Sequence, residues 1–355
     1  MKRIIIAVLL ALTIAWCALG CAQKAGPETA SSVNNTAETQ REKVTPAPQV
    51  NPDAVVWRTP QPPEQAAAGD VWIEPKSGME MVYIPEGDFL LGSSDAELTA
   101  WLKENPKDQR KWFADQQPQC RLSLPGFWIG KTEVTAEQYA RFVQAEKYRT
   151  PDYWEGGVIP AGFEHKPVIL INWPEAQSFC KWAGGHLPLE AQWEKSARGP
   201  DGREFPWGNQ WDSSLCRNFA LIVGQKGFAT DDEQMATLAR WINEHDLVRE
   251  GMSIVGLYPA GASPYGCMDM AGNVWEWCAD WYEAGAYQRY AKDDFTLPAP
   301  GKLQTRVVRS ECFLTGRPER FRCATRIKMG PGEVTGNLGF RCVIEAAPSK
   351  PDTSR

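Results

Sequence analysis

Apolar residues that recur every three or four positions predict three helices. Thr135 and Gln138 form a capping-box pattern, which begins a helix that ends near Glu146. Pro174 suits the first turn of a second helix, and a third, short helix is predicted over residues 190–197. The apolar faces of the first two helices consist of Tyr139, Phe142, Val143, Ala176, Phe179, Cys180 and Ala183.

Short β-prone runs lie between Gly and Pro turns, and long irregular segments separate them. The runs cover residues 81–84, 168–171 and 306–309. Between residues 218 and 254, Asp231 could cap a further helix. That helix would place Met235, Leu238 and Ile242 on one face.

The segment Tyr265–Cys278 has neither the period of a helix nor the alternation of a strand. Gly272 and Asn273 are residue types that tolerate a positive φ. Asp269 and Glu276 offer carboxylate oxygens from either side of this bend, an arrangement that hard cations favour. The segment is therefore either a metal-binding loop or a tight turn that carries two buried tryptophans.

The N-terminus has the features of an export signal. Two basic residues precede an apolar run over residues 4–15, which is too short to cross a bilayer, and a small residue precedes Cys21. This pattern predicts a signal peptide over residues 1–20 and lipidation of Cys21. The alternative is an ordinary secreted protein that is cleaved nearby. Because Ala22 is not aspartate, we expect an outer-membrane anchor if the cell is Gram-negative.

Composition divides the rest of the chain into a tether, one domain and a tail. Residues 21–69 have few large apolar side chains, so they predict a flexible tether, and residues 346–355 predict a polar tail. Residues 70–345 then form one domain, with an insertion at about residues 222–252. The net charge of −6 and the lack of a basic run give no indication of nucleic-acid binding.

Eight cysteines follow Cys21, and disulfides are the usual state of an even number of cysteines in an exported chain. Spacing alone leaves their pairing open. They are Cys120, Cys180, Cys216, Cys267, Cys278, Cys312, Cys323 and Cys342.

Six motifs, in this order, resemble those of the formylglycine-generating enzyme (sulfatase-modifying factor) superfamily, from about Val71 to Ile344. The resemblance implies an α+β fold, a variant of the C-type lectin architecture with little regular secondary structure and with disulfide and calcium bracing. The motifs are Gly78–Phe89, Trp128–Thr135, Leu187–Glu194, Phe205–Asn209, Tyr265–Cys278 and Asn337–Cys342.

The resemblance also implies particular bonds and ligands. Cys180 and Cys342 match a structural disulfide of the family. One calcium site is matched in full, and Asn218 with the carbonyl of Phe219 matches the first half of a second site. The ligands of the full site are the side chains of Asp269 and Glu276 and the carbonyls of Gly272 and Val274.

The enzymes of the superfamily oxidise a protein cysteine with oxygen and a copper(I) ion held by two thiolates. Counting back from Cys323, the two copper positions fall at Phe313 and Pro318, and neither side chain can bind copper. A displaced pair formed by Cys312 and Cys323 has the wrong separation. We expect both of these cysteines in disulfides, with each other or with other partners.

The sequence therefore predicts an exported, lipid-anchored, non-catalytic domain that binds a protein or peptide in the cell envelope, through the groove its enzymatic relatives use for substrate. The alternative is an oxidoreductase that modifies a protein or peptide with a rearranged metal site. A third reading is a structural component of the envelope. We expect calcium as a cofactor and do not expect copper.

Overall fold

The structure is a computed structural model that describes residues 53–296 and 303–347. The predicted signal peptide, Cys21 and residues 348–355 of the predicted tail lie outside these ranges. Within them, none of the helices combines the length and the apolar character needed to span a membrane.

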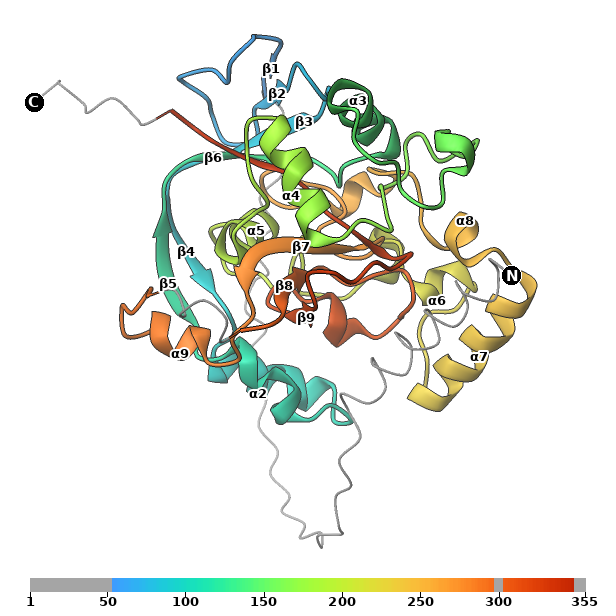
Figure 1. Cartoon of the computed structure of the whole chain (residues 1–355). Coiled ribbons are helices and arrows are strands. Elements are labelled where there is room, and N and C mark those ends of the chain that lie inside the picture. The colour runs from blue at the N-terminus through green and yellow to red at the C-terminus, as the bar shows by residue number, and fades with distance from the viewer. Residues whose placement is uncertain (1–52, 297–302, 348–355) are drawn as a thin grey trace, which may run out of the picture. The chain divides into compact units, whose positions relative to one another are not determined.

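A five-stranded sheet joins the beginning of the domain to its end, in the order β1-β2-β3-β6-β11. The first two strands pair in parallel, and the other neighbours are antiparallel. The C-terminal strand β11 thus lies beside β6 (Figure 1). The strands are β1 (Val56–Trp57), β2 (Val71–Ile73), β3 (Glu80–Ile84), β6 (Phe127–Gly130) and β11 (Val343–Glu345).

A four-stranded sheet, in the order β10-β7-β8-β9, contains the segments with the most unusual sequence. β7 and β8 are antiparallel, with Trp277 opposite Val308 and Trp281 opposite Arg306. A separate sheet contains only β4 and β5. These strands are β4 (Gly87–Leu91), β5 (Cys120–Leu124), β7 (Trp275–Trp281), β8 (Arg306–Arg309), β9 (Ile327–Met329) and β10 (Leu338–Gly339).

Helices surround the sheets, and all three helices predicted from the apolar spacing are present. The cap of α3 is the predicted box, because the Thr135 hydroxyl accepts from the Gln138 N–H and the Gln138 side chain accepts from the Thr135 N–H. The longer helices are α2 (Asp95–Glu104), α3 (Ala136–Glu146), α4 (Trp173–Trp182), α5 (Glu190–Arg198) and α7 (Asp231–Glu244). The shorter ones are α6 (Phe219–Ile222), α8 (Leu247–Gly251) and α9 (Ala286–Tyr290).

The predicted cap of α7 was wrong by one residue. Thr230 is the N-cap, since its hydroxyl accepts from the Glu233 N–H, and Asp231 is the first helical residue. Leu238 is buried on this helix as predicted, whereas Met235 and Ile242 are only half-buried.

The predicted strand over residues 168–171 was also wrong. The backbone there does not join a sheet, because Leu170 has a φ of 56° and the N–H groups of Val168 and Leu170 donate to the carbonyls of Val134 and Thr335. β-branched residues favour an extended backbone, but a strand also needs a neighbouring strand to pair with, and these residues have none in the described part of the chain.

Some residues before the predicted domain also pack against it. Residues of the expected tether form β1, and the Val55 N–H donates to the carboxylate of Asp70 at 2.8 Å. The indole of Trp72 donates to the carbonyl of Thr59 at 2.9 Å. The last part of the predicted tether is therefore part of the fold.

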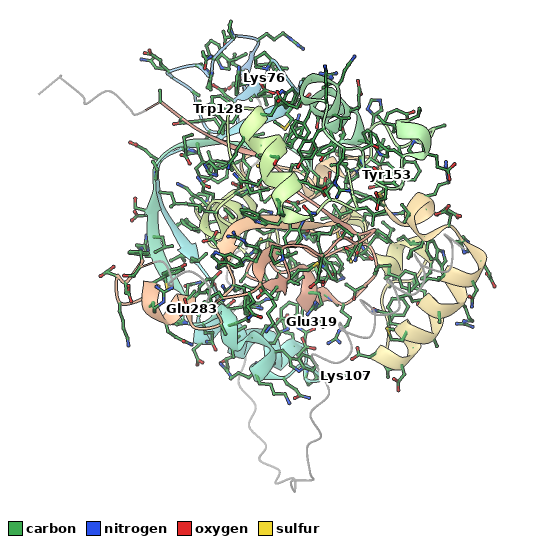
Figure 2. All side chains as sticks on the ribbon, viewed as in Figure 1. Lys76, Lys107, Trp128, Tyr153, Glu283 and Glu319 are labelled. Carbon is green, nitrogen blue, oxygen red and sulfur yellow. The ribbon has the colours of Figure 1, made fainter. Side chains whose placement is uncertain are left out.

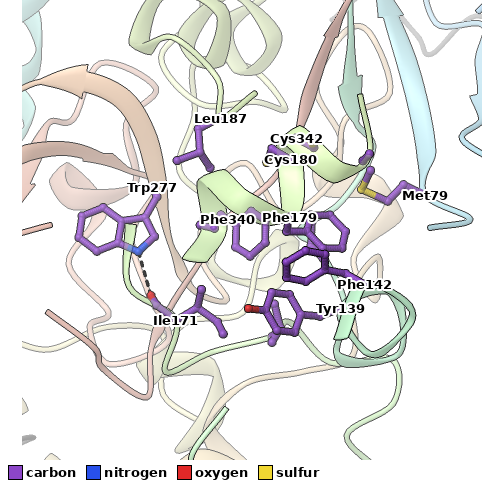
Figure 3. Packing of buried hydrophobic residues seen from close by; sticks show 14 of the residues in the cluster. Met79, Tyr139, Phe142, Ile171, Phe179, Cys180, Leu187, Trp277, Phe340 and Cys342 are labelled. Carbon is purple, nitrogen blue, oxygen red and sulfur yellow. Dashed lines mark hydrogen bonds between the residues drawn. The ribbon is translucent and has the colours of Figure 1, made fainter. Parts of the chain in front are cut away.

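The largest core cluster lies between helices α3 and α4 and the four-stranded sheet (Figure 3). The rings of Tyr139 and Phe179 stack at 5.7 Å, and the Trp277 indole donates to the Ile171 carbonyl at 3.0 Å. Trp128 is fully buried in the same cluster, while Lys76 and Lys107 lie at the surface (Figure 2). This core fixes the strand β7, which follows the predicted calcium loop.

Candidate functional site

The loop before β7 has the bent backbone that its residue types predicted. Asp269, Gly272 and Asn273 have φ angles of 57°, 89° and 62°. A Cβ atom at Gly272 would lie 2.4 Å from the carbonyl oxygen of Arg217, so only glycine fits there. The bend turns Asp269 toward the interior, where it is 7% exposed.

Glu276, the second predicted calcium carboxylate, is fully buried and hydrogen-bonded on both oxygens. Arg341 donates to them through Nε at 2.6 Å and Nη2 at 2.7 Å, and the Trp193 indole donates to Oε2 at 2.8 Å. The structure therefore shows Glu276 as the partner of a buried arginine, a bidentate ion pair that orients both side chains.

Glu133 is a buried carboxyl group in this region that the sequence analysis did not single out. It contacts Asp269, and the Asn273 amide donates to its Oε1 at 3.1 Å, while its Oε2 has no hydrogen-bond partner. Burial first, and then the charges of Asp269 and Glu276, raise the pKa of Glu133 well above its ordinary value. Burial also raises the pKa of Asp269. Two buried carboxyl groups in contact need a proton or a cation between them.

These residues fit a cation only in part. The unpartnered oxygen of Glu133 and the carboxylate of Asp269 are suitable oxygen donors for calcium. In contrast, the Gly272 carbonyl accepts from the Ser310 hydroxyl at 3.3 Å. In the described part of the chain, no three or more His, Cys, Asp or Glu side chains are placed to hold a metal ion, and the predicted set contains only two such side chains. Calcium binding thus remains a prediction.

The half-site predicted at Asn218 and Phe219 has a structural role. The Asn218 Oδ1 accepts from the Leu221 N–H, so this residue is the N-cap of α6. Its amide nitrogen donates to the carbonyls of Ser213 and Cys216. Phe219 is buried and stacks on Phe228 at 5.7 Å.

The two residues predicted to stand at the copper positions of the enzymes lie in the segment after β8. Phe313 is 1% exposed, and its N–H donates to the carbonyl of Asn273 in the bent loop. Pro318 begins the short 3₁₀ helix η5 (Pro318–Phe321). An aromatic ring and a proline provide no soft ligand, so this pair of positions cannot hold copper(I).

Residues of the insertion, which forms α7 and α8 (Figure 1), pack directly on this segment. A Cβ atom at Gly251, the last residue of α8, would lie 2.1 Å from the Phe313 ring, so ring and backbone are in close contact. On α7, the Gln234 Oε1 accepts from the Gly316 N–H at 3.0 Å. The Phe219 N–H donates to the Thr315 carbonyl at 2.8 Å. Residues of α7 and α8 therefore pack on the segment that contains Phe313, a contact that the sequence did not predict.

Two polar contacts lie at the outer edge of the interface between the insertion and the rest of the domain. Arg317 pairs with Asp231 of α7 at 2.8 Å, and the Lys107 ammonium donates to the Ala229 carbonyl at 2.7 Å. The contacts of the insertion thus combine aromatic packing, backbone hydrogen bonds and ion pairs, as in an ordinary protein interior.

The predicted disulfide cysteines are neighbours. Cys180 and Cys342 are fully buried thiols in contact with each other (Figure 3). Burial raises the pKa of Cys180 well above its ordinary value, and the contact with Cys342 raises it further. The structure thus brings the two sulfurs together, and the disulfide itself remains a prediction.

The proposed displaced pair behaves differently. Cys312 accepts a hydrogen bond from the Asn337 amide at 3.2 Å and belongs to the largest core cluster, whereas Cys323 belongs to a second cluster. Burial raises the pKa of Cys323 to about 12. The two thiols thus belong to different clusters of the core.

Comparison with known proteins establishes the family. The profile described as "Sulfatase-modifying factor enzyme 1-like domain" matches residues 68–346, and the chain belongs to this family. It is 26% identical to the formylglycine-generating enzyme of Mus musculus over 323 residues, which cover 76% of each chain. It is also 26% identical to the inactive C-alpha-formylglycine-generating enzyme 2 of Mus musculus, covering 77% of this chain and 88% of that protein.

Two further relatives extend the comparison. The chain is 29% identical to the serine/threonine-protein kinase Pkn1 of Chlamydia trachomatis over 279 residues, which cover 74% of this chain. It spans about two fifths, 38%, of the length of that kinase. The solved structure of PvdO from Pseudomonas aeruginosa has a TM-score of 0.58 and 21% identity, covering 79% of this chain and all of that one. These likenesses confirm the predicted fold of the formylglycine-generating enzyme type.

Proposed function

We propose that this chain is a non-catalytic member of the family that binds a protein or peptide. The observation that carries the proposal is the identity of the residues predicted at the copper positions, Phe313 and Pro318, of which Phe313 packs against Gly251 of the insertion. A relative named as an inactive formylglycine-generating enzyme supports the view that this fold serves roles without the oxidation. A rigid scaffold with variable loops is well suited to recognition.

The position of the insertion changes where such a partner would bind. Gly251 packs on the Phe313 ring and Gln234 binds the backbone of Gly316, so a ligand could not reach these two residues without displacing α8 and α7. The binding surface therefore lies outside the copper position. This differs from a simple reuse of the enzymes' substrate groove.

The experiment is an assay for formylglycine. The purified chain is incubated with copper(I), oxygen, a reductant and a peptide with a Cys-x-Pro-x-Arg sequence. The mass of the peptide is then measured by mass spectrometry. We expect an unchanged mass, because no thiolate stands at either copper position. Conversion of the cysteine to an aldehyde, lost in the Cys312→Ser variant, would overturn the proposal and establish a relocated active site.

An oxidoreductase with a rearranged metal site is the competing function. It requires two thiolates close together, and the separate clusters of Cys312 and Cys323 do not favour it. Titration of the reduced chain with copper(I) separates the two functions. Stoichiometric, cysteine-dependent binding would favour the oxidoreductase, and its absence would favour the binding domain.

The cellular location of the domain belongs to the same proposal. We propose that the chain is exported and lipid-anchored at Cys21, with its partner in the cell envelope, on the strength of the basic start, the apolar run and the small residue before that cysteine. Metabolic labelling with a fatty-acid analogue tests the anchor. Label that is lost in the Cys21→Ala variant is the expected result.

A further inference from the structure

An arginine held between two tryptophans lies at the surface, at the start of β8. We call this set, Trp173, Arg306 and Trp281, the arginine clamp. The guanidinium carbon of Arg306 is 3.8 Å from the ring centroid of Trp173 and 3.6 Å from that of Trp281. The clamp combines the first residue of α4, the last of β7 and the first of β8, so regular elements position all three side chains.

Hydrogen bonds fix the orientation of the clamp. The Arg306 Nη1 donates to the Ala279 carbonyl at 2.6 Å, and the Trp173 indole donates to the Cys278 carbonyl at 2.8 Å. Because indoles cover both faces of the guanidinium, further hydrogen bonds can form only at its edge, in its own plane.

The clamp has no direct ion-pair partner among the described residues, and the charge of Asp280 acts on Arg306 from a greater distance. Among the described residues, no carboxylate lies within 4.0 Å of Arg306, and its Nε is buried without a hydrogen-bond partner. Arg309, three residues later on the same strand, forms ion pairs with Glu190 at 2.9 Å and Glu194 at 2.7 Å. An arginine that is partly removed from water and has no carboxylate at hydrogen-bond distance is expected to favour an anionic ligand.

The clamp is also accessible. Trp281 is 37% exposed, and Arg306 and Trp173 are half-buried. A guanidinium that is already oriented loses little side-chain entropy when a carboxylate binds to its edge with two hydrogen bonds. The indoles offer apolar contact to the carbon chain that carries the carboxylate.

We propose that the arginine clamp is a recognition site for a carboxylate on a peptide segment, either an acidic side chain or a C-terminus. This inference rests on the proposed binding function and names the chemistry of the partner. The shared chemistry of these two sources is one planar carboxylate, for which the fork of an arginine is better suited than the point charge of a lysine.

The test follows the indole N–H signals of Trp173 and Trp281 by NMR in the full chain, with tryptophan labelled by ¹⁵N and the signals assigned from Trp→Phe variants. The probes are acetyl-Gly-Glu-Gly-amide, its Gln counterpart, acetyl-Gly-Glu with a free C-terminus, and inorganic phosphate. We expect saturable shifts with the two Glu-containing peptides and none with the Gln peptide. Tighter binding of acetyl-Gly-Glu than of the amide would show that a C-terminal carboxylate adds to the binding provided by the side chain.

Arg306→Lys keeps the positive charge and removes the planar fork, so the Glu peptides should bind it about tenfold or more weakly. Arg240→Lys is the matched control, because Arg240 is an exposed arginine of α7 that forms no ion pair among the described residues. It should bind as the wild type does. A melting curve shows that each variant is folded, and Trp281→Phe, which keeps an aromatic wall, provides a second variant.

The proposal is overturned by shifts that do not saturate, by equal binding of the Gln peptide, or by unchanged binding to Arg306→Lys. Saturation by phosphate but not by the peptides would assign the clamp to a different ligand and overturn it too. These outcomes are independent of the formylglycine assay. A chain without oxidase activity can lack the carboxylate site, and a chain that binds carboxylates can still form an aldehyde.

Discussion

A single methyl group at Gly251 tests whether the insertion is packed on the copper position. In Gly251→Ala, the new Cβ would lie 2.1, 2.6 and 2.7 Å from the Cε2, Cδ2 and Cζ atoms of Phe313. That ring is 1% exposed and lies in the interior, so it cannot simply turn into solvent. Either the ring shifts within the core or α8 moves away from it, and both responses lose packing.

The expected cost follows from overpacking, which typically destabilises a core by about 1–3 kcal/mol. Alanine is favoured over glycine in a helix by up to about 1 kcal/mol, but Gly251 is the last residue of α8, where little of that gain applies. We therefore expect a net loss of stability in Gly251→Ala. For a domain of this size, the melting temperature should fall by roughly 2–4 °C for each kcal/mol.

The assay is thermal and urea unfolding of four chains in a double-mutant cycle. Phe313→Ala alone should cost about 3–5 kcal/mol, because it deletes a buried ring. In the double variant the methyl group occupies part of the vacated space, so the two costs should fall short of additivity by about 0.5–3 kcal/mol. Gly227→Ala is the matched control in the same insertion, since a Cβ there meets nothing within 4 Å.

Two results would refute the reasoning. If Gly251→Ala is as stable as Gly227→Ala, the contact between α8 and the Phe313 ring does not exist in solution. If the losses of stability in Gly251→Ala and Phe313→Ala are additive, the two substitutions destabilise the domain for separate reasons. In either case the insertion would not cover the copper position, and the groove of the enzymes would be open to a ligand.

Three other predictions concern the bracing of the domain. A chelator should lower the melting temperature of the wild type but not that of Glu276→Ala, because bound calcium would stabilise only the folded state. Without a chelator, the variant should already melt at a lower temperature than the wild type, since Arg341 loses its ion-pair partner. Peptide mapping without reduction should recover Cys180 linked to Cys342, a bond worth about 5 kcal/mol in the chain-entropy model, and a free thiol at either position contradicts it. The hydrogen bond to Glu345 on β11 raises the pKa of the His186 imidazole. The ion pair of these two side chains should therefore add at most about 1 kcal/mol to the stability at this exposed site, in full below about pH 6.5, and this stabilisation should disappear as the pH rises through the raised pKa. A curve of stability against pH that is the same in His186→Gln contradicts this prediction.

The elements that could be predicted from the sequence are those fixed by neighbouring residues. The box at Thr135 and Gln138 caps α3 through bonds within one helical turn, and Gly272 adopts the positive φ that its lack of a side chain permits. Such preferences are local, so a short window of sequence contains all the information they require.

The features that were missed depend on distant parts of the chain. Residues 168–171 are β-prone, but their backbone bonds are made with Val134 and Thr335 rather than with a strand. Residues 56–57 join a sheet only because β2 lies beside them. Glu133 became a candidate only when the fold brought it to Asp269. Hydrophobic pattern and propensity do not specify such pairings.

The copper position illustrates why the identity of the ligands and their surroundings must be considered together. Loss of two cysteines alone would leave an open segment that a substrate could still occupy. Here the replacement at residue 313 is an aromatic ring that the insertion needs for its own packing, and Gln234 of α7 uses its amide to bind the backbone at residue 316. In the proposed function, the residue that replaces a copper ligand is therefore also the surface on which α8 packs. The proposal thus links the chemical and the steric loss of the site, and it predicts a partner that is recognised elsewhere on the surface of the domain.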